Sequence, residues 1–158
     1  MTEAEHEGWF EDFTAGDVYR HARGKTVTEM DNVLITNMVM NTADAHFNEH
    51  RMQKGDLPYK ERVVFGGVVI SMVVGLAAQD TAGRAIAEVG MDKIRLKAPV
   101  FHGDTLYAFS EVLEVRSAER LDGGIAIFRH WGVNQNEQIV FEAERTVLVK
   151  RRMPASLR

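Results

Sequence analysis

The sequence predicts a single α+β domain in which a curved antiparallel sheet wraps around a long buried helix. The chain has 158 residues, which is enough for one well-formed hydrophobic core. An almost wholly apolar segment occupies residues 63–78, near the middle of the chain. Strand-like runs separated by short turns then fill the C-terminal half.

The N-terminal region predicts a lead-in followed by a strand. We expect residues 1–16 to be lightly ordered, with residues 1–9 the loosest part of the single domain that spans residues 1–158. Residues 17–26 alternate between polar and apolar side chains, which is typical of a strand.

A helix is predicted to begin at Thr28, because Thr28 and Asp31 have the spacing of a capping box. Four residues recur at helical spacing and predict its buried face: Met30, Leu34, Met38 and Asn41. This places Asn41 on the buried side at the C-terminal end of the helix.

Two further helical segments are predicted before the strands. Residues 48–55 favour a short helical turn that the Gly-Asp-Leu-Pro sequence at 55–58 breaks. Residues 67–81 are apolar on every side, and a helix without a polar face is buried all round.

The remainder of the chain predicts four long strands and short turns. The strands are expected at residues 85–99, 105–116, 124–133 and 138–150. One strand, a buried helix and then four antiparallel strands describe the hot-dog architecture. Such a sheet leaves an edge strand without a neighbour, so we expect a homodimer or a higher oligomer of dimers.

Composition narrows the range of functions. The net charge of -4 and the pI near 5.9 argue against nucleic acid as a partner. The absence of cysteine excludes a disulfide scaffold, a zinc-thiolate site and a Cys nucleophile. The N-terminal segment does not resemble a signal peptide, and the longest apolar run is too short for a bilayer span. We therefore expect a cytoplasmic protein that does not bind membranes.

The chemistry is expected at two segments that are about twenty residues apart. His46 follows the first predicted helix, and Gly66 and Gly67 precede the apolar one. A general base near a glycine-rich helix N-terminus suits reactions at a thioester carbonyl. Other interpretations are a capping role for His46 and a tight turn at the two glycines.

Three segments resemble one known family. Asn41–Asn48 is similar to its hydratase motif, usually Asp-x-Asn-Pro-x-His-x-Asp, and residues 62–67 are similar to Arg-Ile-Val-His-Gly-Met. Residues 96–106 resemble a strand-turn-strand ending in Pro-Val-x-x-Gly-Asp-Thr. From about residue 10 to residue 151, the chain resembles the MaoC-like dehydratases, the (R)-specific enoyl-CoA hydratases. The Asn-Thr-x-x-x-His pattern is similar to their mesaconyl-CoA hydratase-like branch.

The resemblance implies site residues. His46 matches the catalytic histidine, and Gly66 matches the glycine whose N–H binds the thioester oxygen. Asn41 stands where the family has a catalytic Asp, and Phe65 stands where it has a His. An amide cannot exchange a proton, but its carbonyl oxygen can hold a water molecule. Gly67 is a second candidate oxyanion donor.

Other candidates carry charge. Asp44 lies two residues before His46, so on an extended segment both side chains would face the same way. Arg62, Phe65 and Arg95 are candidate substrate contacts. Lys93, Arg95 and Lys97 alternate on one predicted strand, and this pattern indicates either a solvated face or a contact for CoA phosphates.

The predicted function is hydration or dehydration of a short or branched enoyl-CoA thioester. We expect no metal and no cofactor other than the CoA of the substrate. One alternative is a thioesterase that uses Asp44 to activate water; another is an acyl-CoA-binding subunit without activity, because Asn41 replaces an acid. Of the remaining histidines, we expect His130 to be exposed and His21 to have no functional partners.

Overall fold

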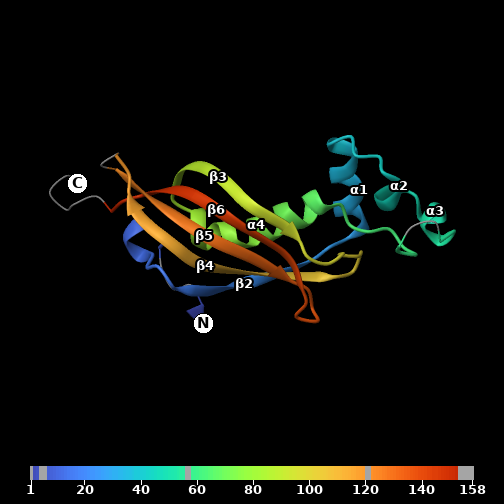
Figure 1. The fold of residues 1–158 in the computed structure, drawn as a ribbon, viewed down its shortest axis with the longest axis horizontal. Coiled ribbons are helices and arrows are strands. Elements are labelled where there is room, and N and C mark those ends of the chain that lie inside the picture. The colour runs from blue at the N-terminus through green and yellow to red at the C-terminus, as the bar shows by residue number, and fades with distance from the viewer. Residues whose placement is uncertain (1, 4–6, 56–57, 120–121, 153–158) are drawn as a thin grey trace.

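A six-stranded sheet curves around helix α4 (Gly66–Ala82) in the computed structural model, which describes residues 2–3, 7–55, 58–119 and 122–152 (Figure 1). The strand order is β1-β2-β4-β5-β6-β3. The strands are β1 (Thr2–Glu3), β2 (Val18–Thr26), β3 (Ala85–Leu96), β4 (Thr105–Ser117), β5 (Gly123–Val133) and β6 (Ile139–Lys150). β1 pairs with β2 in parallel, and the other neighbours are antiparallel.

Short helices project from one end of the sheet (Figure 1). They are α1 (Glu29–Met38), α2 (Asp44–Phe47) and α3 (Glu49–Gln53), and a 3-10 turn, η1, covers Phe10–Asp12. The predicted strands and the helix at 67–81 are confirmed to within a few residues. The short helix predicted at 48–55 is α3, whereas α2 is an element that the sequence did not indicate. Residues 56 and 57 of the predicted break lie outside the described residues.

The lead-in packs against the sheet. Phe13 is buried and meets the Phe128 ring edge-on, with 5.0 Å between centroids. The Arg84 guanidinium lies 3.9 Å from the centre of the Trp9 ring. Aromatic side chains of the described part of this lead-in therefore pack against the rest of the molecule, and the loose order expected for residues 1–9 stays a prediction. Residues 1 and 4–6 lie outside that part.

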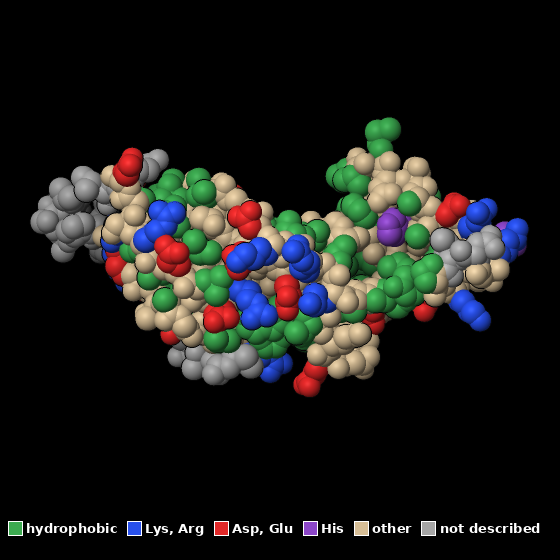
Figure 2. Space-filling view, viewed as in Figure 1, with side chains coloured by type: hydrophobic (Ala, Val, Ile, Leu, Met, Phe, Trp, Pro, Cys, Tyr) green, Lys and Arg blue, Asp and Glu red, His purple; other side chains and the backbone are tan. Residues whose placement is uncertain are grey.

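Helix α1 begins as predicted but buries a different face. The Asp31 N–H donates to Thr28 Oγ1 at 3.2 Å, and the Thr28 N–H donates to the Asp31 carboxylate at 2.7 Å. The face predicted to be buried is exposed: Met30 by 65%, Leu34 by 55% and Met38 by 78%. Hydrophobic side chains cover the tip of this projecting segment, and a hollow separates it from the body of the molecule (Figure 2).

Two polar residues form the buried face of α1 instead. Asn32 and Thr36 are fully buried, and the Thr36 hydroxyl donates to the Asn32 carbonyl oxygen at 2.8 Å. Asn41 lies beyond the end of the helix and is half-buried. The periodicity of the apolar residues therefore predicted the wrong face, since α1 stands at the end of the molecule rather than over its core.

Helix α4 packs one side on the sheet. Val73 and Ala77 are fully buried on that side, and a Cβ at Gly132 of β5 would overlap Val73. Three residues spaced by four are exposed on the other side: Ser71, Gly75 and Gln79. The prediction of burial all round is therefore wrong for this chain by itself. Across the described ranges, no helix combines the length and hydropathy that a membrane span requires.

A row of buried polar side chains crosses the concave face of the sheet beneath α4. His21 of β2 lies 2.6 Å from the Asp80 carboxylate and 2.7 Å from Ser110 Oγ of β4. The same hydroxyl lies 2.7 Å from Nδ1 of His130 in β5, and both histidines are buried. The expectations of an exposed His130 and an isolated His21 are wrong, because alternate residues of these strands face inward.

This row predicts a pH-dependent stability. Burial, with the nearby positive charge of Arg145 and the nearby His21, lowers the pKa of His130 from 6.5 to about 3. Between those values the unfolded chain binds a proton that the folded chain rejects, so stability rises with pH and is lost as the pH falls. We expect about 1.5 kcal/mol less unfolding free energy from this residue at pH of about 5 than at about 6.5.

Denaturant unfolding at several pH values measures this slope. The His130→Phe variant should reduce it over this range, whereas His50→Gln, at an exposed histidine, should keep the wild-type slope. An unchanged slope in His130→Phe would contradict a buried neutral His130.

Candidate active site

His46 is held by the chain that leads into α4. Its Nδ1 lies 2.8 Å from the Val63 carbonyl oxygen, and the Val63 N–H donates to the Ala45 carbonyl oxygen at 2.9 Å. A carbonyl oxygen only accepts hydrogen bonds, so Nδ1 carries the proton. In the neutral ring, Nε2 then bears the free lone pair, which is the form that a general base needs.

The N-terminus of α4 lies beside this ring. Phe65 is the N-terminal capping residue, and its ring centroid is 5.6 Å from that of His46. Gly66 and Gly67 are the first two residues of the helix, where N–H groups have no acceptor within the helix. The positive end of the helix dipole favours negative charge at this point. A Cβ at Gly66 would overlap the Leu96 side chain, so glycine allows Leu96 to lie close to the first turn of the helix.

These groups share one cavity of about 630 Å³. Its lining includes His46, Tyr59, Phe65, Gly66, Gly67 and Lys97. The remaining lining residues are mostly apolar and come from the chain around α4 and the end of β3. The cavity therefore places a base, helix N–H donors and an apolar wall together.

Asn41 and Asp44 are not among the described residues that line this cavity. The side-chain Oδ1 of Asn41 accepts from the Ala43 N–H at 3.2 Å, which orders the turn into α2. Asp44 is exposed, and its carboxylate accepts from the Asn48 side chain at 3.4 Å. Because α2 is helical rather than extended, Asp44 and His46 do not share a direction. The premise that brought Asp44 to the site is wrong.

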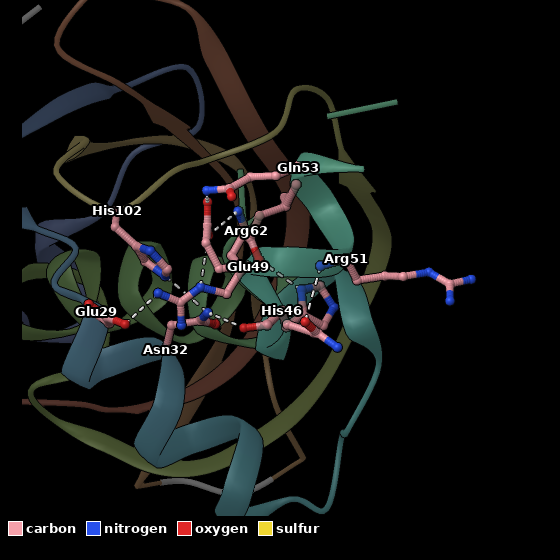
Figure 3. Close-up of polar contacts among 10 residues, drawn as sticks. Glu29, Asn32, His46, Glu49, Arg51, Gln53, Arg62 and His102 are labelled. Carbon is pink, nitrogen blue, oxygen red and sulfur yellow. Dashed lines mark hydrogen bonds and ion pairs between the residues drawn. The ribbon is translucent and has the colours of Figure 1, made fainter. Parts of the chain in front are cut away.

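Arg62 connects helix α1 to helix α3 (Figure 3). Its guanidinium pairs with Glu29 of α1, and its Nε lies 3.1 Å from Glu49 of α3. Hydrogen bonds from Arg62 lower the pKa of both carboxyl groups below their ordinary value. The structure thus gives Arg62 two partners within the chain, and its role as a substrate contact stays a prediction.

The three cations in and just after β3 have different surroundings. Lys93 pairs with Glu144 at 2.7 Å on the solvated face, and Arg95 donates to the Ile94 carbonyl oxygen at 2.9 Å. Lys97 follows the strand and lines the cavity. The solvated-face interpretation therefore holds for Lys93, whereas Lys97 lies where an anionic group of a bound molecule could reach it.

One residue near the site was missed in the sequence. Asn32 of α1 lies between His46 and His102 (Figure 3), and hydrogen bonds connect its amide to both residues and to Phe65. The only signal for it was the four-residue spacing of Asn32 and Thr36, two polar residues on the side of the helix opposite to the apolar periodicity.

Solved structures with this architecture define the class of protein. A MaoC domain protein dehydratase from Chloroflexus aurantiacus has a TM-score of 0.84, with 28% identity, over 95% of this chain and 46% of that chain. A Mycobacterium tuberculosis protein described as a double hotdog fold has a TM-score of 0.81, with 20% identity, over 93% and 46% of the two chains. The predicted hot-dog fold is confirmed, and the chain is of the MaoC dehydratase type.

The chain belongs to the mesaconyl-CoA hydratase family, whose model matches residues 3–151. A mesaconyl-CoA hydratase from Haloarcula marismortui is 31% identical over 90% of this chain and 42% of its own length. A beta-methylmalyl-CoA dehydratase from Chloroflexus aurantiacus is 34% identical over 66% of this chain and 29% of its own length. The family resemblance is thereby confirmed. The chain spans less than half the length of these two relatives.

The hydrogen bond to Val63 predicts the tautomer of His46. Nitrogen-15 NMR of the imidazole groups at alkaline pH should show His46 protonated on Nδ1, because the carbonyl oxygen requires a donor there. The His46→Gln variant identifies the signal by its loss. Protonation on Nε2 would contradict this hydrogen bond. The basic nitrogen of the ring would then be Nδ1, which faces Val63.

Proposed function

We propose that the chain is a hydratase domain that adds or removes water across the 2,3 double bond of an enoyl-CoA thioester. The observation that carries this proposal is the cavity shared by the His46 ring and the first N–H groups of α4. Membership of the mesaconyl-CoA hydratase family supports it. The names of the relatives favour a short, branched acyl group.

The reaction needs a base, a proton donor and a site for negative charge. His46 Nε2 takes a proton from water as the water oxygen bonds to C3 of the acyl chain. The electron pair of the double bond moves to the thioester oxygen, where the Gly66 or Gly67 N–H stabilises the enolate. A donor of this kind is worth roughly 3–4 kcal/mol in the transition state. The protonated His46 then returns the proton to C2, which balances the reaction.

The amide at position 41 affects the route of the proton in this proposal. Because an amide cannot exchange protons, a second acid is absent at this position and His46 carries the proton both ways. The side-chain Oδ1 of Asn41 already accepts from Ala43. Its second lone pair can still hold the attacking water, so the water-positioning role of Asn41 remains part of the proposal.

Binding of the CoA moiety would use the cations near the cavity. Lys97 lines the cavity, and Arg95 lies two residues before it near the end of β3, so we assign both to the anionic groups of CoA. Phe65 would contact the acyl group, since its ring lines the same wall. No cofactor beyond CoA and no metal enters this proposal.

We also propose a homodimer or dimer-based oligomer, located in the cytoplasm. β3 is an edge strand with exposed apolar side chains, with Val89 at 58%, Ile94 at 41% and Leu96 at 55%. The exposed stripe of α4, which contains Gly75, provides a second surface of small side chains. Because Leu96 lines the cavity, a partner along β3 would also close the cavity from outside.

The direct test is incubation with crotonyl-CoA and mesaconyl-CoA. The absorbance of the conjugated enoyl thioester should fall with no free thiol appearing. Release of CoA would indicate a thioesterase instead, and tight binding with neither signal would indicate a binding subunit.

Removal of the base should abolish this activity. We expect His46→Ala to lower turnover by at least about 10²-fold, since general base catalysis contributes that much. The matched control is His50→Ala, which removes an exposed histidine from the neighbouring helix α3 and should leave turnover unchanged. Near-full activity in His46→Ala would disprove the assignment of the base.

Restoring an acid at position 41 tests the proton route. We expect Asn41→Asp to retain or increase turnover, because a carboxylate can accept from the Ala43 N–H and can also share activation of water. Steady-state kinetics with the preferred thioester measure this. A collapse of activity in a folded variant would show that the amide group itself is required.

A further inference from the structure

We propose that Asn32 is a positioning residue that sets the placement of His46 relative to the N-terminus of α4. This inference rests on the proposed function, because it concerns the same site. Asn32 lies on α1 and does not belong to the motifs that identify the base or the oxyanion donors. Its side chain points toward His46 (Figure 3) and hydrogen-bonds to the backbone of His46 and of Phe65, the residue before Gly66.

The amide makes one hydrogen bond to each half of the site. Its Oδ1 accepts from the Phe65 N–H at 2.9 Å, at the residue that immediately precedes Gly66. Its Nδ2 donates to the His46 carbonyl oxygen at 3.3 Å. A backbone N–H only donates and a carbonyl oxygen only accepts, so these two partners fix the orientation of the amide.

His102 adds a third hydrogen bond to the amide. Its Nε2 lies 3.1 Å from Nδ2 of Asn32, and an amide nitrogen can only donate. His102 therefore accepts at Nε2, and its own proton lies on Nδ1. A reversed amide would place an oxygen against the His46 carbonyl oxygen and a nitrogen against the Phe65 N–H, so these two backbone groups decide the orientation. Asn32 is thus held from three directions by groups of matched polarity.

Burial makes these hydrogen bonds hard to replace. Asn32 is fully buried, so water does not substitute for a lost partner. Loss of the amide would remove the hydrogen-bond partner of the Phe65 N–H and of the His46 carbonyl oxygen. A buried polar group without a partner costs free energy of folding. The least costly response is a shift of the chain that carries His46 or of the start of α4.

Such a shift would affect turnover more than binding. A misplacement of about 1 Å at catalytic groups can cost about 10²-fold in rate. The wall residues Leu96, Ala98, Pro99 and Val100, together with Lys97, belong to another segment, and the Asn32 side chain makes none of its three hydrogen bonds to them. A saturated thioester should therefore still bind, while the reacting groups no longer meet the double bond correctly.

The experiment compares two fully buried polar residues of the same helix face. Asn32→Leu removes the amide at similar volume, and Thr36→Val is the matched control, since the Thr36 hydroxyl, which this change removes, donates to carbonyl oxygens of its own helix. Asn32→Asp keeps an acceptor for Phe65 but loses the donor to His46. His102→Gln keeps an acceptor for Asn32, whereas His102→Leu does not.

We expect Asn32→Leu to lower kcat by about 10²-fold, with a change of less than about threefold in the Kd of butyryl-CoA. Asn32→Asp and His102→Leu should lower kcat too, whereas Thr36→Val and His102→Gln should stay near wild type. Hydrogen exchange should show loss of protection at the Phe65 amide in Asn32→Leu, and retained protection in Asn32→Asp and Thr36→Val.

Equal losses in Asn32→Leu and Thr36→Val would overturn the proposal, because they would reflect only general destabilisation of α1. Unchanged kcat in a folded Asn32→Leu variant would overturn it as well. A wild-type protein without hydratase activity would refute the proposed function instead. Hydrogen exchange at the Phe65 amide would then still test the positioning role of Asn32. Unchanged protection in Asn32→Leu would refute that role.

Discussion

The docking of the segment around α2 onto the chain that leads into α4 is the interaction on which the rest of the site depends. The His46 ring binds the Val63 carbonyl oxygen, and the Val63 N–H binds back to Ala45. This reciprocal pair fixes the protonated nitrogen of the ring and its distance from the helix N-terminus. Arg62, next in the chain, adds charged contacts to α1 and α3. The His46 ring and the N-terminus of α4 are therefore joined by one connection, to which Asn32 of α1 adds hydrogen bonds at His46 and Phe65.

That connection also explains how helix α1, at the end of the molecule, can affect a cavity in its body. α1 contributes no lining residue among the described part of the chain, and its Met30, Leu34 and Met38 side chains are exposed, whereas Ile35 packs against the core. Its buried face is polar because it meets backbone groups that need partners. The buried row that contains His21, Ser110 and His130 shows the same principle beneath α4. In both places hydrogen bonds join polar side chains to groups on neighbouring elements, while Nε2 of His130 has no hydrogen-bond partner among the described residues.

Patterns that depend on local physics were readable in the sequence. Strand alternation, the apolar run of α4 and the capping box at Thr28 all predicted real elements, since each is decided by nearby residues. The buried face of α1 and the inward direction of His130 were not predictable, because alternation and periodicity do not say which side faces the core. His46 and Gly66 were placed together correctly, whereas Asp44 was not, because a four-residue helix is too short to show a period.

A crystal structure with bound butyryl-CoA tests the central claim most directly. The thioester oxygen should lie about 2.7–3.1 Å from the N–H nitrogen of Gly66 or Gly67. His46 Nε2 should face C2 and C3 of the acyl chain, with Nδ1 still bound to the Val63 carbonyl oxygen. A thioester oxygen bound away from the start of α4, or an acyl chain out of reach of His46, would contradict the account.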